Sequence, residues 1–408
     1  MKKKSAQTVT EDEKIIQDEA KYLLGTYQRP KFVIEKGYGC YLYDTEGKRY
    51  LDMVSGIAVN ALGYADEGLS RVIAEQARKL IHCSNLYHTA LHVNLARMLV
   101  ENSFADKVFF CNSGAEAVEG AMKLARKWAL KTFGCEKAGF VAFTGSFHGR
   151  TFGALALTDR EKYRLPFEPL VPGARFAHFG DVDDAESKIS TDTSAVIVEP
   201  IQGEGGMNPA GPRFLAALAD LCRRKDVLLI FDEVQCGLGR TGRLFAYQHS
   251  GVIPDMLCLA KPLAGGLPMG AVLASERVAQ CIESGDHATT FGGGPLVSAA
   301  AIEVLRRIRR PSFLQAVRDK GEFLLGRLKQ LKQRFPDKVV AVRGLGLMVG
   351  VELSFKAAPL MQQFYDRGVL VCTAGERVIR VVPPLVISKR QIDIFVRAFA
   401  HVLEQAKN

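Results

Sequence analysis

The chain carries a series of short, wholly apolar runs, and several of them are separated by stretches with helical spacing. The runs lie at 108–111, 140–143, 195–198, 227–231, 256–260 and 271–274. Helical spacing is found at 115–131 and again at 212–224. A run that is apolar at every position is typical of a strand buried on both faces. The middle of the chain therefore predicts an α/β fold with a mostly parallel central sheet covered by helices.

The two ends of the chain have a different pattern, which predicts a smaller α+β domain beside the large one. Residues 1–24 are polar and charged without clear periodicity, and we expect a loosely ordered arm there. Alternation and turn signals predict short strands in 25–66, the N-terminal part of the small domain. We expect the large domain over 67–300 and the C-terminal part of the small domain over 301–408.

Helical spacing also predicts several longer helices outside the central runs. It dominates 67–99, continues over a long region at 296–334, and returns in a last helix at 389–405. Between the last two, apolar segments around 344–351, 369–371 and 378–382 predict the strands of the C-terminal part.

Composition excludes several broad classes of protein. The chain has 408 residues, of which 48% are hydrophobic and 24% charged, which is ordinary for a globular protein. Its apolar runs are far too short to cross a bilayer, so we expect no membrane association. Lys2, Lys3 and Lys4 are followed by no apolar segment, and we expect no secretory signal peptide.

Charge and cysteine content refine this picture. The 54 Lys and Arg residues against 44 Asp and Glu give a net charge of +10, but the basic residues are scattered, with the densest cluster at 306–310. This favours a solvated surface and a site for anionic small molecules over nucleic-acid binding. The nine cysteines form no C-x-x-C pair, which favours reduced thiols and a cytoplasmic location.

Three of the apolar runs end in residues that can carry chemistry. Ser113 and Gly114 open a helix, whose free N–H groups suit a phosphate, although Ser113 could equally be only an N-cap. Asp232 and Glu233 follow a wholly apolar strand, where one carboxylate needs either a cationic partner or a capping role. Lys261 ends another buried strand, where desolvation favours a neutral amine, although a lysine there can also simply extend to solvent.

Together these three features predict a site for pyridoxal 5′-phosphate. The carboxyl ends of parallel strands meet at one edge of a sheet, where ligands bind. Lys261 would form an imine with the cofactor, and Asp232 would pair with the pyridine nitrogen and keep it protonated. The phosphate would lie on Ser113, Gly114 and the helix that starts at Ala115.

Longer motifs resemble one family. They are 110–117 (FCNSGAEA), 146–151 (SFHGRT), 199–206 (EPIQGEGG), 231–242 (FDEVQCGLGRTG), 259–261 (LAK), 289–293 (TTFGG) and 378–384 (VIRVVPP). The chain resembles the class III, fold-type-I pyridoxal-phosphate aminotransferases, in unbroken order from about residue 25 to the end. Within that family the resemblance is greatest to members that act on acetylornithine.

The resemblance implies a role for individual cofactor-binding residues. Lys261 is the implied imine-forming lysine and proton shuttle, and Asp232 the implied pyridinium partner. Gln235 would lie near the phenolic oxygen, and Phe147 would stack on the ring. Thr290 would reach the phosphate from the second subunit, which implies a homodimer with shared active sites. The implied cofactor contacts also include Ser113, Gly114, Ala115, His148 (with no catalytic role) and Glu199.

The resemblance also implies how substrates are bound. Arg150 would grip the α-carboxylate of the amino acid. Glu204 and Arg380 would form a switchable ion pair, in which Glu204 neutralises Arg380 until a dicarboxylate such as 2-oxoglutarate or glutamate arrives. The implied reaction transfers the terminal amine of N2-acetyl-L-ornithine to 2-oxoglutarate, a step of arginine biosynthesis. Alternatives are ornithine, succinylornithine or 4-aminobutyrate as donor, or an aminomutase or racemase of the same fold.

The chain departs from the pattern of the family at four places. Ala115 stands where a threonine hydroxyl is often found, and Gly294 replaces an asparagine. Residues 64–67 replace a histidine-containing run, and Pro262 follows the lysine, which restricts the backbone of Lys261. These departures bear on the substrate more than on the chemistry.

Overall fold

The structure is a computed structural model that describes residues 10–134 and 137–406. Its centre is a seven-stranded sheet with the strand order β4-β12-β11-β10-β7-β5-β6. The strands are β4 Lys107–Cys111, β5 Gly139–Phe143, β6 Ala174–Ala177, β7 Thr193–Val198, β10 Leu228–Asp232, β11 Met256–Leu259 and β12 Gly270–Ala274. Neighbours from β11 to β6 are parallel, whereas β12 is antiparallel to both β11 and β4. The predicted mostly parallel sheet is therefore confirmed.

The two faces of this sheet are buried in two different hydrophobic clusters. In β10, Leu228 and Ile230 belong to the cluster that contains α5 (Gly114–Phe133). Leu229 and Phe231 belong to the cluster that contains α9 (Pro212–Arg224). Because successive side chains of a strand point to opposite faces, a strand covered on both sides must be apolar at every position. This explains the uninterrupted apolar runs in the sequence.

Besides α5 and α9, the middle of the chain contains several further helices. They are α3 Glu67–Lys79, α4 Ala90–Val100, α6 Phe152–Ala156, α7 Glu161–Arg164, α8 Val182–Lys188, α10 Glu276–Ala279 and α11 Pro295–Ile308, with the short helices η1 Leu165–Phe167, η2 Ala246–His249 and η3 Lys261–Ala264. Helix α3 packs on α11. A small two-stranded ladder joins β8 Ile201–Gln202 to β9 Asn208–Pro209.

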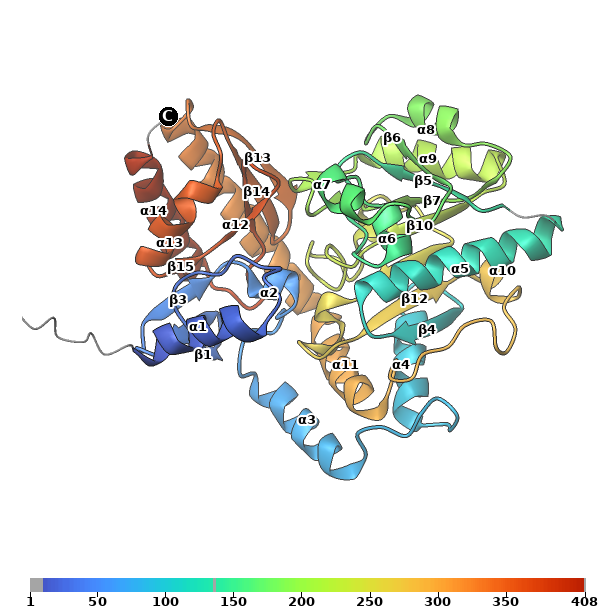
Figure 1. Ribbon diagram of the computed structural model, residues 1–408, viewed down its shortest axis with the longest axis horizontal. Helices are drawn as coiled ribbons and strands as arrows, with labels where there is room; N and C mark the ends of the chain where they lie inside the picture. The colour runs from blue at the N-terminus through green and yellow to red at the C-terminus, as the bar shows by residue number, and fades with distance from the viewer. Residues whose placement is uncertain (1–9, 135–136, 407–408) are drawn as a thin grey trace, which may run out of the picture.

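The N-terminal and C-terminal segments of the chain lie together, as the blue and the orange-to-red ribbons in Figure 1 show. One four-stranded sheet has the order β1-β2-β3-β15, and another has the order β13-β14-β17-β16. Their strands are β1 Ile34–Tyr38, β2 Tyr41–Asp44, β3 Arg49–Asp52, β13 Val339–Leu345, β14 Met348–Leu353, β15 Val369–Leu370, β16 Cys372–Ala374 and β17 Val378–Val381. The helices beside them are α2 Ser55–Ala58, α12 Pro311–Arg334, η4 Ala358–Leu360, α13 Met361–Asp366 and α14 Lys389–Gln405.

Two local expectations need correction. The arm contains a helix, α1 (Glu11–Tyr22), which the sequence analysis missed because no residue of it is buried and its apolar periodicity is weak. A capping box joins Thr10 and Glu13 at its start and satisfies free N–H groups of the first turn. Residues 1–9 lie outside the described residues. The helical region at 296–334 is two helices, because Pro311 starts α12 after the break at Arg309. The domain boundaries stay a prediction.

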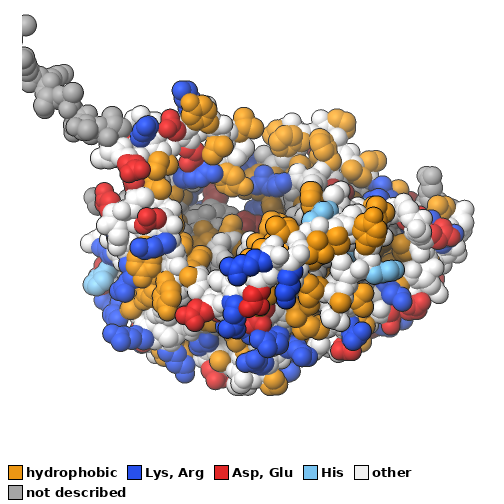
Figure 2. Space-filling model, turned by 90° about the horizontal axis from the view of Figure 1, so that it is seen from below, with side chains coloured by type: hydrophobic (Ala, Val, Ile, Leu, Met, Phe, Trp, Pro, Cys, Tyr) orange, Lys and Arg blue, Asp and Glu red, His pale blue; other side chains and the backbone are white. Residues whose placement is uncertain are grey.

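The distribution of charged side chains on the surface and the state of the cysteines agree with what the composition predicts. Figure 2 views the molecule from the side of α3 and α4, and basic side chains there are interspersed with acidic and apolar ones. Eight cysteines fall within the described residues, and all of them are free thiols. No helix in the described part of the chain is both long and apolar enough to span a bilayer.

Candidate active site

A cavity of about 400 Å³ lies where several strands of the central sheet end. The segment after β4 contributes Ser113 to its lining, the segment after β5 contributes Phe147, β10 contributes Asp232 at its last position, and the segment after β11 contributes Lys261. The predicted phosphate seat, carboxylate and lysine thus line one cavity. The parallel arrangement of β10 and β11 brings the last two together, because both strands end at the same edge of the sheet.

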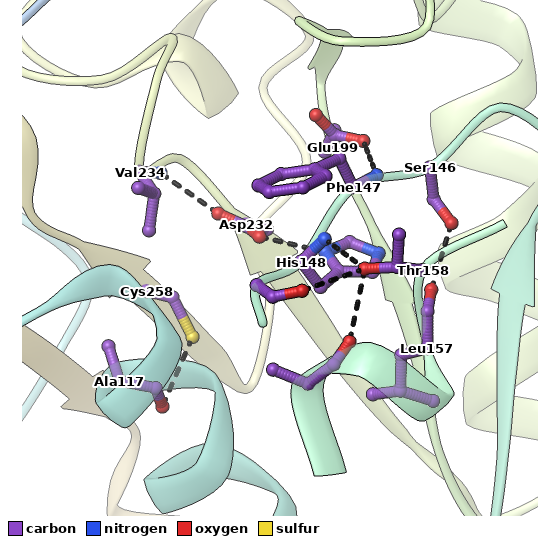
Figure 3. Close-up of polar contacts among 12 residues, drawn as sticks. Ala117, Ser146, Phe147, His148, Leu157, Thr158, Glu199, Asp232, Val234 and Cys258 are labelled. Atoms are coloured by element: carbon purple, nitrogen blue, oxygen red, sulfur yellow. Dashed lines mark hydrogen bonds and ion pairs between the residues drawn. The ribbon is translucent and has the colours of Figure 1, made fainter. Parts of the chain in front are cut away.

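Asp232 is buried and holds a defined hydrogen-bonding position. Its Oδ1 accepts the Val234 N–H at 3.0 Å, and its Oδ2 lies 2.7 Å from Nδ1 of His148. Figure 3 shows the His148 ring between Asp232 and Thr158, whose hydroxyl accepts the His148 backbone N–H. Burial lowers the pKa of His148, but its hydrogen bond to Asp232 and the charges of Asp232 and Glu199 outweigh burial and raise that pKa. The contact with Asp232 therefore favours the charged form of the His148 imidazole.

Glu233 points away from this cavity. Its carboxylate oxygens accept the N–H groups of Ala246, at 2.5 Å, and Tyr247, at 2.6 Å, at the start of η2. Burial raises the pKa of Glu233 to about 8, although these two N–H groups oppose the shift. Of the two adjacent carboxylates, Asp232 therefore belongs to the site, and Glu233 fixes a loop behind it.

The surroundings of Lys261 favour the neutral form of its amine. Burial lowers the pKa of Lys261, and the charge of Arg380 acts in the same direction, while Asp232, Glu204 and Glu199 oppose the shift. Its backbone has a φ of +42°, in the left-handed region. The following Pro262 disfavours the ordinary helical conformation at Lys261. A non-glycine residue in this region carries roughly 1–2 kcal/mol of strain, and such strain tends to gather at functional sites.

Phe147 and Glu199 line the cavity next to this group. The Phe147 N–H donates to Oε2 of Glu199 at 3.1 Å, and the Gly203 N–H donates to Oε1 at 3.1 Å. Burial raises the pKa of Glu199 to about 7, with the charge of His148 opposing this shift and that of Asp232 adding to it. Glu199 thus fixes the backbone that carries the Phe147 ring (Figure 3).

The start of α5 forms a seat for an anion. The Ser113 side chain accepts the Glu116 N–H at 3.2 Å, so Ser113 is the N-cap, as the simpler interpretation of the sequence had it. Within the described residues, no hydrogen bond is found for the N–H groups of Gly114 and Ala115, which also line the cavity. A Cβ on Gly114 would lie 2.7 Å from Cγ1 of Val234, so only glycine fits here. Capping and anion binding are compatible, because they use different N–H groups.

Gln235 lines the same cavity with an unsatisfied polar atom. Its Oε1 is buried and has no hydrogen-bond partner among the described residues. A Cβ on Gly203 would lie 2.4 Å from the Gln235 Nε2, so the glycine leaves the room that this amide occupies. A buried amide without a partner costs free energy unless a ligand completes it.

The predicted substrate-binding residues are distributed around the cavity. Arg150 lines it and lies over the Tyr163 ring, with 3.6 Å from its Cζ to the ring centroid. Arg380 is buried and forms an ion pair with Glu204, as predicted from the resemblance, but neither residue lines the cavity itself. Both are close enough to act on the Lys261 charge.

Thr290 is not brought to this cavity within one chain. It lines a separate hollow of about 790 Å³, together with Asn85 and His92. Among the described residues, Thr290 is not part of the lining of the cavity that contains Ser113 and Gly114.

The sequence analysis missed several residues of the site. Val59 and the segment from Gly266 to Met269 also line the cavity, and Thr158 holds the backbone of His148. The Gly-Gly and Leu-Pro pairs after Lys261 are a turn signal that could have located the second segment. No local signal marks Val59 or Thr158, because only the folded chain brings them here.

Comparisons with known proteins agree with this geometry. A family model described as aminotransferase class-III matches residues 25–403. The chain belongs to the class III aminotransferases. A mitochondrial acetylornithine aminotransferase from Alnus glutinosa is 50% identical over 93% of this chain and 85% of its own length. The acetylornithine aminotransferase of Methanocaldococcus jannaschii is 43% identical over 95% of this chain and 98% of its own length.

Solved structures show the same family relationship for this aminotransferase. The N-acetylornithine aminotransferase of Stenotrophomonas maltophilia has a TM-score of 0.82 at 36% identity and covers 95% of this chain and 98% of its own. The ornithine aminotransferase of Toxoplasma gondii has a TM-score of 0.93 at 30% identity and covers 97% of this chain and 96% of its own. The fold is therefore fold-type I, as predicted.

Class III aminotransferases use pyridoxal 5′-phosphate, and the residues present fit that cofactor. Gln235, whose Oε1 has no partner among the described residues, the N–H groups of Gly114 and Ala115 at the start of α5, and the buried Asp232 offer a polar group for each polar part of the molecule. The cavity between them is lined in part by the Phe147 ring, and Lys261 lines it too. This aminotransferase thus has the donors, acceptors and amine that the cofactor requires.

Proposed function

We propose that this aminotransferase transfers the terminal amine of N2-acetyl-L-ornithine to 2-oxoglutarate, giving N-acetylglutamate 5-semialdehyde and glutamate, as in arginine biosynthesis. The names of the relatives at 43% to 50% identity support this donor. The observation that carries the proposal is the ion pair of Glu204 with the buried Arg380, close to Lys261. This pair suits an enzyme that accepts two acids of different charge.

The ion pair explains how one site can serve both substrates. Acetylornithine has one carboxylate, whereas 2-oxoglutarate has two, so only the second substrate needs a second cationic group. An unpaired buried arginine would be costly while the donor is bound, because its charge is desolvated. Glu204 neutralises Arg380 in that state and leaves it when the second carboxylate of 2-oxoglutarate arrives.

The backbone around Glu204 is held in place, so we expect the switch to be a rotation of its side chain. Arg160 donates to the Glu204 carbonyl at 2.7 Å, and the Nε of Arg343 donates to the Gly206 carbonyl at 2.8 Å. The Glu204 side chain is 24% exposed, against 4% for Arg380, so Glu204 is the partner with room to move. Arg380 stays in position to receive the dicarboxylate.

The remaining residues divide the work of holding the cofactor and moving protons. Bound pyridoxal phosphate supplies an electron sink for the carbon that bears the reacting amine. Ser113, Gly114 and Ala115 would hold its phosphate, Asp232 its ring nitrogen, Gln235 its phenolic oxygen and Phe147 its ring face. Lys261 would bind it covalently and, once displaced by the donor amine, would take the proton from the reacting carbon. A depressed pKa suits this role, because a neutral amine is both nucleophile and base.

Arg150 is the proposed partner of the α-carboxylate of the amino acid. Its guanidinium lies over the Tyr163 ring and near the Phe147 ring, so these two aromatic rings help to hold it in place. A guanidinium held in one plane can bind a carboxylate through two parallel hydrogen bonds.

We further propose that two copies of the chain assemble into a homodimer with shared active sites. Thr290 lies in a hollow flanked by exposed apolar side chains, among them Leu86 at 84%, Tyr87 at 70% and Phe291 at 64% exposure. Such a surface favours association, and a partner subunit would let Thr290 reach the phosphate seat opposite. Sedimentation velocity would test this, and a monomer at micromolar concentration would contradict it. The cytoplasmic location stays a prediction that the free thiols favour.

A donor panel tests the proposed reaction. Purified enzyme loaded with cofactor is offered acetylornithine, succinylornithine, ornithine or 4-aminobutyrate with 2-oxoglutarate, and glutamate formation is measured. We expect the highest kcat/KM with acetylornithine. Lys261→Ala is the matched control and should abolish turnover and the absorbance of the covalently bound cofactor. A higher kcat/KM with another donor would replace acetylornithine, and absence of glutamate with every donor would favour an aminomutase or racemase.

A further inference from the structure

Cys372 makes a direct contact with the arginine of the proposed substrate switch. The Nε of Arg380 donates to the Sγ of Cys372 at 3.2 Å, while Nη1 of the same guanidinium bonds to Glu204. Cys372 and Arg380 are directly opposite each other in the antiparallel pair of β16 and β17. The side chains of such a pair lie on the same face of the sheet. The contact therefore follows from the strand register.

The other neighbour of Arg380 in this row has no side chain. Arg380 is opposite Gly350 in the pairing of β14 with β17. A Cβ on Gly350 would lie 2.8 Å from the Cβ of Met207, so a side chain has no room there. Of the two residues that flank Arg380 across the sheet, only Cys372 can support the guanidinium.

Resting on the proposed function, we propose that Cys372 is a positioning residue that orients Arg380 for the second carboxylate of 2-oxoglutarate or glutamate. The guanidinium donors lie in one plane. Contacts at Nε and at Nη1 fix the rotation of that plane. When Glu204 leaves, the contact at Nε remains, and the end of the guanidinium, Nη1 with Nη2, faces the incoming carboxylate for a bidentate bond.

A thiol suits this task better than a carboxylate would. Sulfur is a weak, neutral acceptor, so it orients Arg380 without neutralising the charge that must attract the dicarboxylate. Burial raises the pKa of Cys372 and so favours the neutral thiol. The charge of Arg380 and its hydrogen bond to the sulfur oppose this shift but do not reverse it. The positive charge of Arg380 is left for Glu204 and the dicarboxylate.

The test compares the two substrates in Cys372→Ala, with cofactor-loaded enzyme in both directions. We expect the KM values for 2-oxoglutarate and glutamate to rise roughly three- to tenfold, the size of one lost hydrogen bond. The KM for acetylornithine and the kcat at saturating substrate should stay within about twofold, because this donor binds while Glu204 neutralises Arg380. Cys372→Ser should keep the KM values for 2-oxoglutarate and glutamate close to those of the unaltered enzyme, since the serine hydroxyl can accept a hydrogen bond from Nε of Arg380.

Two further variants keep the outcome interpretable. Cys40→Ala removes a different cysteine, which is buried in the same part of the molecule, and should leave both KM values unchanged. Cys372→Val replaces Cys372→Ala if the cavity left by alanine prevents folding, because valine fills the space without accepting a hydrogen bond.

The possible results separate this inference from the proposed function. An equal rise in KM for both substrates, or a serine variant no better than the alanine variant, would overturn the role of Cys372. If Arg380→Gln leaves the KM for 2-oxoglutarate unchanged, or the unaltered enzyme forms no glutamate, the proposed function itself fails and takes this inference with it.

Discussion

The pair of His148 and Asp232 makes a prediction whose size and pH dependence follow from its geometry. The two side chains are 0% and 5% exposed, and their atoms Nδ1 and Oδ2 are 2.7 Å apart. The Nε2 of His148 has no partner among the described residues, so His148→Phe removes only the contact with Asp232 and keeps a ring of similar shape. A buried, charge-assisted hydrogen bond contributes about 1.5–3 kcal/mol, and a neutral one about 0.5–1.5 kcal/mol.

The sign of the pH dependence follows from the raised pKa of His148. A group with a raised folded-state pKa contributes its full stability below its ordinary pKa of 6.5 and loses it as the pH rises through the folded-state value. The free energy of unfolding of His148→Phe should therefore be lower than that of the unaltered chain by about 1.5–3 kcal/mol near pH 6. The difference should shrink toward about 0.5–1.5 kcal/mol as the imidazole becomes neutral.

Urea unfolding of the cofactor-free enzyme, followed by circular dichroism from pH 6 upward through the folded-state pKa of His148, measures the difference in the free energy of unfolding. His148→Asn is the matched control, because its amide can donate one neutral hydrogen bond to Asp232 and does not titrate. We expect its deficit to be the same at every pH. A pH-independent deficit in His148→Phe would refute the assignment of a charged imidazole, and no deficit at all would refute the contribution of the hydrogen bond.

Three further predictions concern the cofactor and the switch. In Gly203→Ala, the new Cβ would lie 2.4 Å from Nε2 of Gln235, so the amide must move. We expect the affinity for the cofactor, measured by equilibrium dialysis, to fall about tenfold or more. An unchanged affinity would contradict the placement of Gln235. Glu204→Ala leaves the buried Arg380 charge unpaired, which should raise the KM for acetylornithine more than the KM for 2-oxoglutarate. A larger increase in the KM for 2-oxoglutarate, measured by steady-state kinetics, would exclude the switch. Thr290→Val should weaken cofactor binding in the dimer, and mixing it with Lys261→Ala should recover activity if each subunit completes the other's site; no recovery would argue against a shared site.

The central sheet and its edge were predictable because uninterrupted apolar runs in the sequence indicate strands that are buried on both faces. A strand covered on both faces must be apolar at every position, so the runs at β7, β10 and β11 could be found from the sequence alone. The residues at or just beyond the ends of β10 and β11 were then expected at one edge, and Asp232 and Lys261 do line one cavity there. Helix α1 was missed for the opposite reason, since none of its residues is buried.

The local sequence thus determined the strand–helix rhythm, the reduced state expected of the cysteines and the three kinds of group needed for a phosphorylated aldehyde cofactor. Tertiary structure decided what Glu233 does, because its carboxylate accepts the N–H groups of Ala246 and Tyr247 at the start of η2. It also decided that His148 supports Asp232 and that Cys372 supports Arg380. These contacts join residues from different strands and loops, and their distances depend on strand register and packing, which no local pattern of polar and apolar residues encodes.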